Sequence, residues 1–258
     1  MEIEFAYVAL GLAALFAGFV DAVVGGGGLI QLPALMAAFP AGSAPVLFGT
    51  NKVSSIVGTS SAALQYSRRV AIPWRVAAPG ALAALVGSWY GARAVVWLRP
   101  EVLRPLVLVL LVLVAIHTFM KKDLGARSTE GEHGLRAMGI AGAIGGGIGF
   151  YDGFFGPGTG SFLIFLFIRT LGMDFLRASM TAKLVNVATN LAAILFFARK
   201  VELMWALGGL MAVCNLCGAV LGSRMALRHG TGFVRMMFLG VVCVLIGKLT
   251  WDMVTTGF

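Results

Sequence analysis

Apolar runs of roughly 20 residues follow one another along the chain and predict a series of membrane-spanning helices. They lie near residues 5–24, 44–67, 76–97, 102–120, 137–155, 177–198, 203–227 and 233–252. Two shorter runs, 28–40 and 160–172, come directly after glycine-rich stretches. A helix over the 13 residues 28–40 is only about 20 Å long, too short for the ~30 Å hydrocarbon core. We expect each short run either to extend through its glycines or to form a re-entrant helix.

The second half of this pattern repeats the first at a constant offset, which indicates an internal duplication. Scarce residue types coincide at an offset of 131 residues: Asp21 with Asp152, Lys52 with Lys183, Arg68 with Arg199, Trp74 with Trp205, and Arg93 with Arg224. The one long hydrophilic stretch separates the halves. We therefore expect a first transmembrane repeat at 1–120, a cytoplasmic linker loop at 121–136 and a second transmembrane repeat at 137–258.

Composition places the chain among polytopic all-α membrane proteins. Of its 258 residues, 59% are hydrophobic and 12% charged, whereas a soluble domain carries about 25% charged residues. The net charge of +9 would suggest nucleic-acid binding in a soluble protein. Here the basic residues flank apolar runs, as orientation signals do. We expect the lipid bilayer as a partner and no nucleic acid.

The number of crossings decides how the two repeats are oriented. If all five segments of each half cross, the loops at 68–75, 121–136, 169–177 and 224–235 share one side and carry twelve Lys and Arg, against five at 93–104 and 199–200. The first side is then cytoplasmic, and an odd number of crossings inverts the second repeat. With four crossings the charges divide almost evenly. We favour two inverted five-segment repeats with 8–10 transmembrane helices, including short broken or re-entrant ones.

Two intramembrane lysines occupy equivalent positions, Lys52 in Gly-Thr-Asn-Lys and Lys183 in Thr-Ala-Lys. A lysine at mid-bilayer costs about 2.5–3.5 kcal/mol and normally faces a cavity or a partner. Hydroxyl or amide side chains follow on the same helical face: Ser55 and Thr59 after Lys52, and Asn186 and Asn190 after Lys183. Together with Asn51, they suit a desolvated oxyanion. The alternative is that the lysines snorkel to an interface or pair with Asp21 and Asp152.

Glycine-rich breaks occupy matching positions at 25–28 and 156–161. Bare backbone at membrane depth is tolerated where it lines a cavity or is buried, and the N-terminus of the following helix is a ready anion site. Matched breaks in two halves point to a transporter's binding site. The candidate binding residues there are Gly27, Gly28, Gly158, Thr159, Gly160 and Ser161. The alternative is that the glycines only allow close helix packing.

Asp21 and Asp152 are the only acidic residues deep in predicted spans. Each is a candidate for proton coupling or for a counter-ion to a lysine. Each could equally accept hydrogen bonds from the backbone of the adjacent break. The three histidines are scattered, so we expect no metal site, no cofactor and no catalytic constellation.

The chain resembles the sulfite exporter TauE/SafE family of anion permeases. The likeness rests on Phe-Val-Asp-Ala-Val-Val-Gly-Gly-Gly-Gly-Leu at 19–29 with Gly-Thr-Asn-Lys at 49–52, and on Asp-Gly-Phe-Phe-Gly-Pro-Gly-Thr-Gly at 152–160 with Thr-Ala-Lys at 181–183. The resemblance implies a multi-pass secondary transporter of the bacterial inner membrane that moves sulfite, thiosulfate or sulfonates and is not an enzyme. Its partner would be a small inorganic or organosulfur anion, with a homodimer left open.

Two alternatives belong to other functional classes, and a carrier of a different anion is a nearer alternative. The chain could carry other small anions or carboxylates, or it could be a membrane sensor or assembly protein that transports nothing. An intramembrane enzyme would need a nucleophile and base, which the sequence does not supply.

Overall fold

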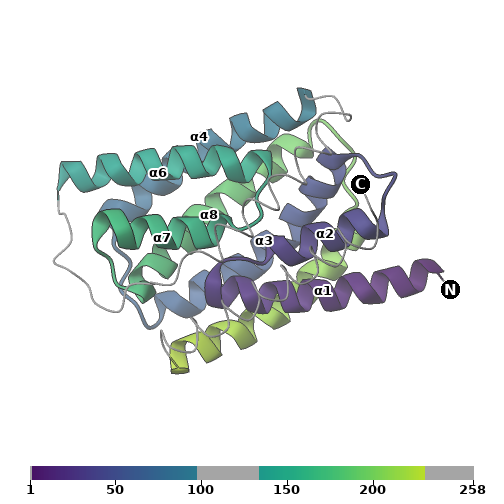
Figure 1. Ribbon diagram of the computed structural model, residues 1–258, viewed down its shortest axis with the longest axis horizontal. Coiled ribbons are helices and arrows are strands. Elements are labelled where there is room, and N and C mark those ends of the chain that lie inside the picture. Colours follow the sequence, from purple (N-terminus) through teal and green to yellow (C-terminus); the bar gives the residue numbers. More distant parts are fainter. Residues whose placement is uncertain (1, 98–133, 230–258) are drawn as a thin grey trace, which may run out of the picture.

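The computed structural model describes residues 2–97 and 134–229, and within these ranges the chain forms eight helices and no strand (Figure 1). The helices of the first half are α1 (Glu2–Val24), α2 (Gly28–Ala38), α3 (Ala44–Ser67) and α4 (Trp74–Trp97). Those of the second half are α6 (Leu135–Phe154), α7 (Thr159–Leu171), α8 (Phe175–Phe197) and Trp205–His229, which we call the Trp205 helix. The predicted segments 102–120 and 233–252, and the linker up to residue 133, lie outside the described residues.

The helices recur at the offset found in the sequence. The second, third and fourth helices start at residues 28, 44 and 74 in the first half and at 159, 175 and 205 in the second, each 131 residues later. Every predicted segment within the described ranges is a helix. The hydrophobic pattern therefore located these elements correctly, and the duplication extends to the helix boundaries.

Local sequence explains where the central helices break. Gly25 follows α1 with a φ of +79°, and Gly156 follows α6 with a φ of +97°. This left-handed conformation is easy for glycine and costly for residues with a Cβ atom. At the start of α8, the side chain of Asp174 accepts a hydrogen bond from the backbone nitrogen of Arg177 at 3.0 Å and caps the helix.

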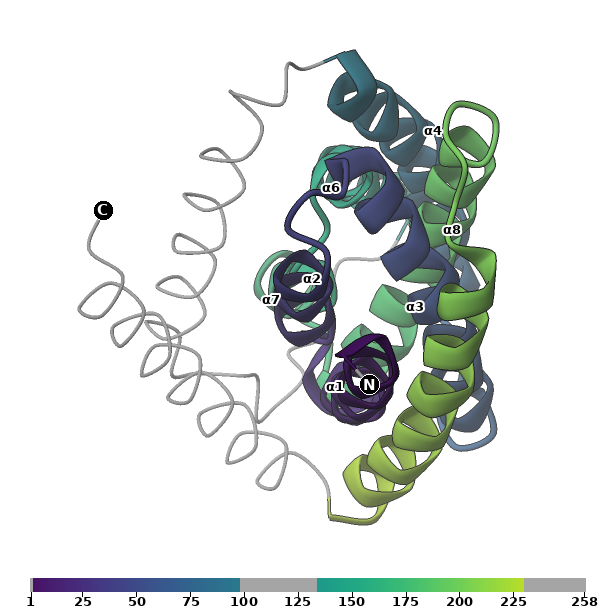
Figure 2. The same ribbon diagram turned by 90° about the vertical axis from the view of Figure 1, so that its right-hand side faces the viewer.

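The two short helices begin near the middle of the molecule and run toward opposite ends. Figure 1 shows α1 entering from the end marked N and α2 returning toward that end, whereas α6 and α7 do the same from the other end. In the end-on view of Figure 2, α2 and α7 overlap between α6 and α1, with α3, α4 and the Trp205 helix to one side. With 11 and 13 residues, or about 16 and 20 Å, neither short helix spans a bilayer alone.

Glycines let helices from different halves approach closely. A Cβ atom at Gly87 or Gly91 of α4 would collide with the backbone of α6, and one at Gly218 or Gly222 of the Trp205 helix would collide with the backbone of α1. These two contacts are equivalent under the 131-residue offset. Each half therefore packs its fourth helix against the first helix of the other half.

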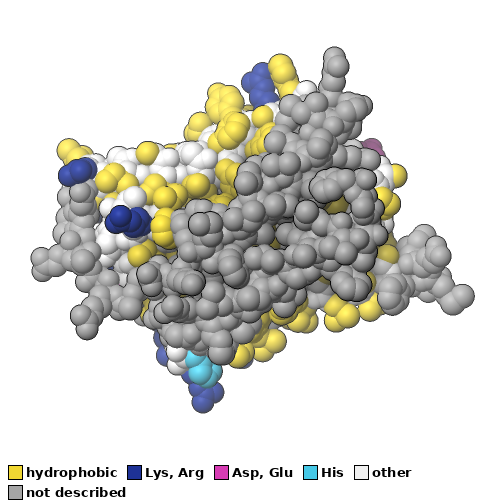
Figure 3. Space-filling view, viewed as in Figure 1, with side chains coloured by type: hydrophobic (Ala, Val, Ile, Leu, Met, Phe, Trp, Pro, Cys, Tyr) yellow, Lys and Arg dark blue, Asp and Glu magenta, His cyan; other side chains and the backbone are white. Residues whose placement is uncertain are grey.

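The helices match a multi-pass membrane protein. Within the described ranges, Ala6–Val24, Phe175–Phe197 and Trp205–His229 are long and apolar enough to cross a bilayer. Trp74 and Trp205 are 62% and 55% exposed at the starts of their helices, as expected for anchors at a membrane interface. On the face shown in Figure 3, the described surface is largely hydrophobic, and Lys and Arg side chains lie toward its ends and edges.

Candidate functional site

A small polar cavity lies where the two glycine breaks meet α3 and α8. Its volume is about 20 Å³, roughly the room needed for one water molecule. Both predicted stripes and both breaks contribute to its lining: Asp21, Gly25, Gly28, Asn51, Lys52, Ser55, Asp152, Gly156, Gly158, Thr159, Gly160, Asn186 and Asn190. Gly25 and Gly156 were not among the predicted site residues, although their matching positions four residues after each aspartate were a usable signal.

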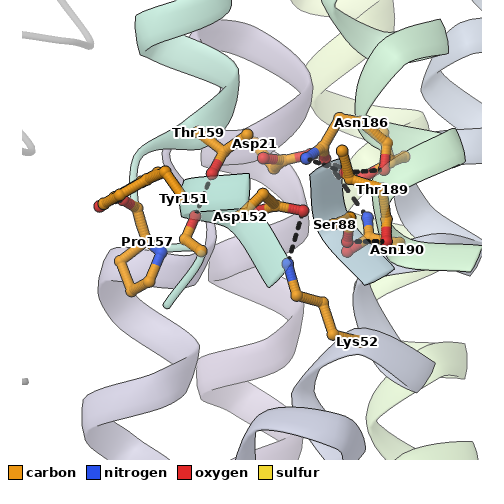
Figure 4. Close-up of polar contacts among 12 residues, drawn as sticks. Asp21, Lys52, Ser88, Tyr151, Asp152, Pro157, Thr159, Asn186, Thr189 and Asn190 are labelled. Carbon is orange, nitrogen blue, oxygen red and sulfur yellow. Dashed lines mark hydrogen bonds and ion pairs between the residues drawn. The ribbon is translucent and has the colours of Figure 1, made fainter. Parts of the chain in front are cut away.

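A buried ion pair forms one wall of this cavity (Figure 4). Lys52 Nζ of α3 lies 2.7 Å from Asp152 Oδ2 of α6, and the two side chains are 4% and 1% exposed. Gly156 leaves room for the ammonium group, since a Cβ atom there would lie 2.9 Å from Nζ. The pair joins the first half to the second. The sequence analysis left open that the lysines pair with aspartates, and this is confirmed for Lys52.

Asp21 faces the same cavity but has different partners. One carboxylate oxygen accepts a hydrogen bond from the Thr59 hydroxyl at 3.0 Å, and the other accepts one from the backbone nitrogen of Gly27 at 3.4 Å. This confirms that Asp21 accepts a hydrogen bond from the broken segment. Thr59 and Gly27 do not line the cavity themselves, but they hold the carboxylate that does.

Lys183 lies outside the lining of this cavity, and the expectation that both lysines bind one anion stays a prediction. Its Nζ donates to the backbone carbonyl of Asp21 at 3.3 Å and lies 4.8 Å from the ring centroid of Tyr66. The Tyr66 hydroxyl donates to the carbonyl of Ala22 at 3.1 Å and so fixes the ring against α1. Each lysine thus reaches the aspartate of the other half, Lys52 through the carboxylate and Lys183 through the main chain.

The starts of α2 and α7 meet at the cavity. The backbone nitrogens of Gly158 and Gly160 donate no hydrogen bond to any described residue. Both lie at the start of α7, where the helix dipole favours an anion. A Cβ atom on Gly160 would lie 2.6 Å from the Gly25 Cα. The glycines therefore allow close packing and also leave backbone donors at the site.

The hydroxyls of the second break are already bonded to backbone. Ser161 Oγ donates to the carbonyl of Val24 at 2.7 Å, and the Ser161 nitrogen donates to the carbonyl of Gly25 at 3.0 Å. Thr159 Oγ1 donates to the carbonyl of Gly156 at 2.7 Å. Ser161 lies outside the cavity lining and ties the two breaks together, and its role as a ligand stays a prediction.

Amide side chains on α8 complete the cavity. Asn190 Nδ2 donates to Asn186 Oδ1, and Asn186 Nδ2 donates to Thr189 Oγ1, both at 3.4 Å. Ser88 of α4 supports this turn by donating to the Thr189 carbonyl at 2.7 Å. Asn51 Oδ1, on the α3 side, is buried and has no hydrogen-bond partner among the described residues.

A second buried polar contact was missed by the sequence reading. Asn215 of the Trp205 helix donates to Gln31 Oε1 of α2 at 2.9 Å, and Gln31 Nε2 donates to the Asn51 carbonyl at 3.5 Å. The residues at the positions equivalent to Gln31 and Asn215 are Phe162 and Ala84. Because both equivalents are apolar, the repeat comparison could not have singled out this network.

Comparisons with known proteins show the family of this chain. The family model described as sulfite exporter TauE/SafE matches residues 10–249. The chain belongs to this family. It is 35% identical over 242 residues to a probable membrane transporter protein, YfcA, of Escherichia coli K12, covering 93% of this chain and 87% of that protein. No solved structure matches the chain.

Two further relatives carry the same description. A probable membrane transporter protein, ORF9, of a Sinorhizobium species is 33% identical over 247 residues, covering 93% of this chain and 91% of that protein. A probable membrane transporter protein of Haemophilus influenzae is 30% identical over 237 residues, covering 92% and 91%. The chain is a TauE/SafE membrane transporter, and the motifs that carried the resemblance, around Asp21, Lys52 and Asp152, meet at its central cavity.

Proposed function

We propose that this TauE/SafE protein transports small sulfur-containing anions, such as sulfite, thiosulfate or sulfonates, by alternating access. The observation that carries the proposal is the Lys52–Asp152 pair beside the start of α7. An anion that enters the bilayer loses its hydration, so a carrier must replace water with cationic groups and hydrogen-bond donors. Such groups are Lys52, the hydroxyl of Ser55, and the backbone nitrogens of Gly158 and Gly160, which donate to no described residue.

Asp152 acts in this proposal as an internal competitor of the substrate. Its carboxylate is itself an oxyanion and occupies the Lys52 ammonium at 2.7 Å. Substrate binding then requires Asp152 to move away or to take up a proton, and protonation leaves Lys52 free for the anion. In the second case transport is coupled to protons, because each anion that binds Lys52 is accompanied by one proton on Asp152. Asp21, which belongs to the first half, would take part in the same proton coupling.

Alternating access explains why the cavity is so small. A volume of about 20 Å³ holds one water molecule, whereas sulfite has four non-hydrogen atoms. In this proposal the structure corresponds to a closed state, and the small cavity supports it. Lys52 belongs to the first half and Asp152 to the second, so movement of one half against the other separates them and enlarges the site. Such movement of repeats around a fixed site is common among transporters.

An inverted arrangement of the repeats is part of the proposal. The opposite directions of α1 and α6, and of α2 and α7, support it (Figure 1). So does the exchange of contacts between halves, because α4 packs on α6 as the Trp205 helix packs on α1. The basic loop at 68–75 and the loop between α7 and α8 share one end of the molecule, which we assign to the cytoplasm. The membrane would be the bacterial inner membrane.

The test is uptake by proteoliposomes that contain the purified full-length chain, with a pH gradient imposed across the membrane. Sulfite, thiosulfate and sulfoacetate represent the proposed class, and acetate and succinate represent carboxylates. We expect at least one sulfur anion to be taken up and the uptake to collapse when a protonophore removes the gradient. Uptake of carboxylates alone would show that the transported substrates are carboxylates and not sulfur-containing anions. Absence of any uptake would favour a membrane sensor or assembly protein.

A further inference from the structure

An open cleft with four arginines lies at one end of the molecule, between the last turns of α3 and the Trp205 helix. Its volume is about 890 Å³, and it shares no lining residue with the central cavity. Figure 3 shows basic side chains gathered at the lower edge of the molecule, where the Trp205 helix ends in Figure 1. The described residues that line the cleft are Ser61, Leu64, Gln65, Arg68, Arg69, Val220, Arg224, Leu227 and Arg228.

The cleft presents cationic donors without described acidic partners. None of the four arginine side chains forms an ion pair or a ring contact with a described residue. No Asp or Glu is among the described lining residues. Gln65 adds a further donor, since its Nε2 is buried and has no hydrogen-bond partner among the described residues. This donor set fits an anion with several oxygens, because arginine binds phosphate oxygens in pairs.

The remaining lining is aliphatic, which narrows the class of ligand. Leu64, Val220 and Leu227 lie beside the arginines, and Leu64 is 56% exposed. The cleft is much larger than a sulfite-sized ion needs. A ligand with an anionic head and an apolar tail satisfies both parts of the wall, and basic pockets between transmembrane helices bind anionic lipid head groups.

The equivalent place in the other half is filled in part by packed aromatic rings, although Trp97 at its edge is 74% exposed. The 131-residue offset pairs Gln65 with Phe196, Val220 with Trp89 and Arg228 with Trp97. The rings of Trp89 and Phe196 pack edge to face with centroids 5.2 Å apart. Arg199, the equivalent of Arg68, lies 5.5 Å from the Trp89 centroid.

The arginines of that filled site therefore have aromatic partners within the protein. Arg93, the equivalent of Arg224, lies 5.0 Å from the Trp97 centroid. Packing requirements common to the two halves do not explain the open cleft. At equivalent backbone positions, one half has packed aromatic side chains and the other has an open cleft. What distinguishes the open copy is the loss of three aromatic side chains and the gain of Arg228 and an unpartnered amide.

We propose that this cleft binds an anionic phospholipid, with its phosphate among Arg68, Arg69, Arg224 and Arg228 and an acyl chain along Leu64, Val220 and Leu227. The site is separate from the transport site and does not depend on which anion is carried.

Native mass spectrometry of the purified full-length chain tests the proposal, with phosphatidylglycerol and phosphatidylcholine as lipid probes. We expect retention of phosphatidylglycerol to exceed that of phosphatidylcholine by about tenfold or more. Arg68→Gln with Arg224→Gln should abolish this preference. Val220→Trp, which copies the filled site and keeps every arginine, should abolish it too. Arg75→Gln is the matched control, since Arg75 is exposed near the same end but lines no part of the cleft.

Three results would overturn the proposal. Equal retention of the two lipids by the wild-type chain would show that the arginines do not select an anionic head group. A phosphatidylglycerol preference that survives both the double arginine variant and Val220→Trp would place the lipid elsewhere. Displacement of the lipid by sulfite or inorganic phosphate at the concentrations used for transport would make the cleft a site for soluble anions. The two variants act by different means, so misfolding of one leaves the other as a test.

Discussion

Removing either partner of the Lys52–Asp152 pair should destabilise the protein more than removing both. Lys52→Met leaves a carboxylate that is 1% exposed without its cation, and Asp152→Asn leaves an ammonium that is 4% exposed without its anion. Losing one partner of a buried pair costs about 3–5 kcal/mol. In the double variant no charge remains buried, and we expect a cost of about 1–3 kcal/mol for the imperfectly bonded amide.

Unfolding by titration with sodium dodecyl sulfate, followed by circular dichroism, measures these free energies in mixed micelles. If the single costs simply added, the double variant would lose about 6–10 kcal/mol, so the expected interaction energy is several kcal/mol. Lys200→Met removes an exposed lysine and serves as the control, with an expected change within about 0.5 kcal/mol. Costs that add within error would refute the reasoning, because the two groups would then not be an isolated buried pair.

Two further outcomes test the packing of the breaks and the inversion of the repeats. Gly160→Ala should destabilise the fold by about 1–3 kcal/mol in thermal unfolding, because its Cβ atom would meet the Gly25 backbone. The control is Gly147→Ala, whose Cβ atom meets no atom and which should be neutral or stabilising. Equal effects of the two variants would contradict the close approach of Gly160 to Gly25. In a cysteine-free background, Ala71→Cys and Glu202→Cys occupy equivalent exposed loop positions. An impermeant maleimide should label Glu202→Cys on intact cells and Ala71→Cys only after permeabilisation, and labelling from one side would contradict inversion.

The helices were predictable because the bilayer imposes a simple pattern on the sequence. A span needs a long apolar run, and the duplication supplied each boundary twice, so segments such as 44–67 and 28–40 were located within a few residues. The central site was predictable for a related reason. Lysine and aspartate are rare at membrane depth, so their recurrence pointed to two lysine and two aspartate positions, and of these four residues only Lys183 lies outside the cavity lining.

The partners of these residues were not predictable from the repeat. The duplication suggests that Lys52 and Lys183 do the same thing, but Lys183 reaches only the main chain of Asp21 and packs on Tyr66. The difference arises because the Asp21 carboxylate is held by Thr59 and Gly27. A repeat comparison reveals equivalent positions, whereas the choice of hydrogen-bond partner depends on side chains that differ between the halves.

The open arginine cleft also shows that a repeat comparison does not predict the surroundings of matched residues. Arg68 and Arg224 matched Arg199 and Arg93 in the sequence, and the match alone gave no sign that their surroundings differ. The surroundings differ because aromatic rings fill one copy and not the other, as the contact of Arg199 with Trp89 shows. Packing differences of this kind become visible only when neighbouring helices are placed together.

The central claim, that Lys52 binds a transported anion, is tested most directly by sulfite uptake into proteoliposomes under a pH gradient. The wild-type chain is compared with the double variant Lys52→Met with Asp152→Asn, after circular dichroism has shown that the variant is folded. The account predicts uptake by the wild-type chain and a loss of about a hundredfold or more in the variant, since a charge-assisted hydrogen bond and its buried cation are removed. Uptake by the folded variant at the wild-type rate would contradict it.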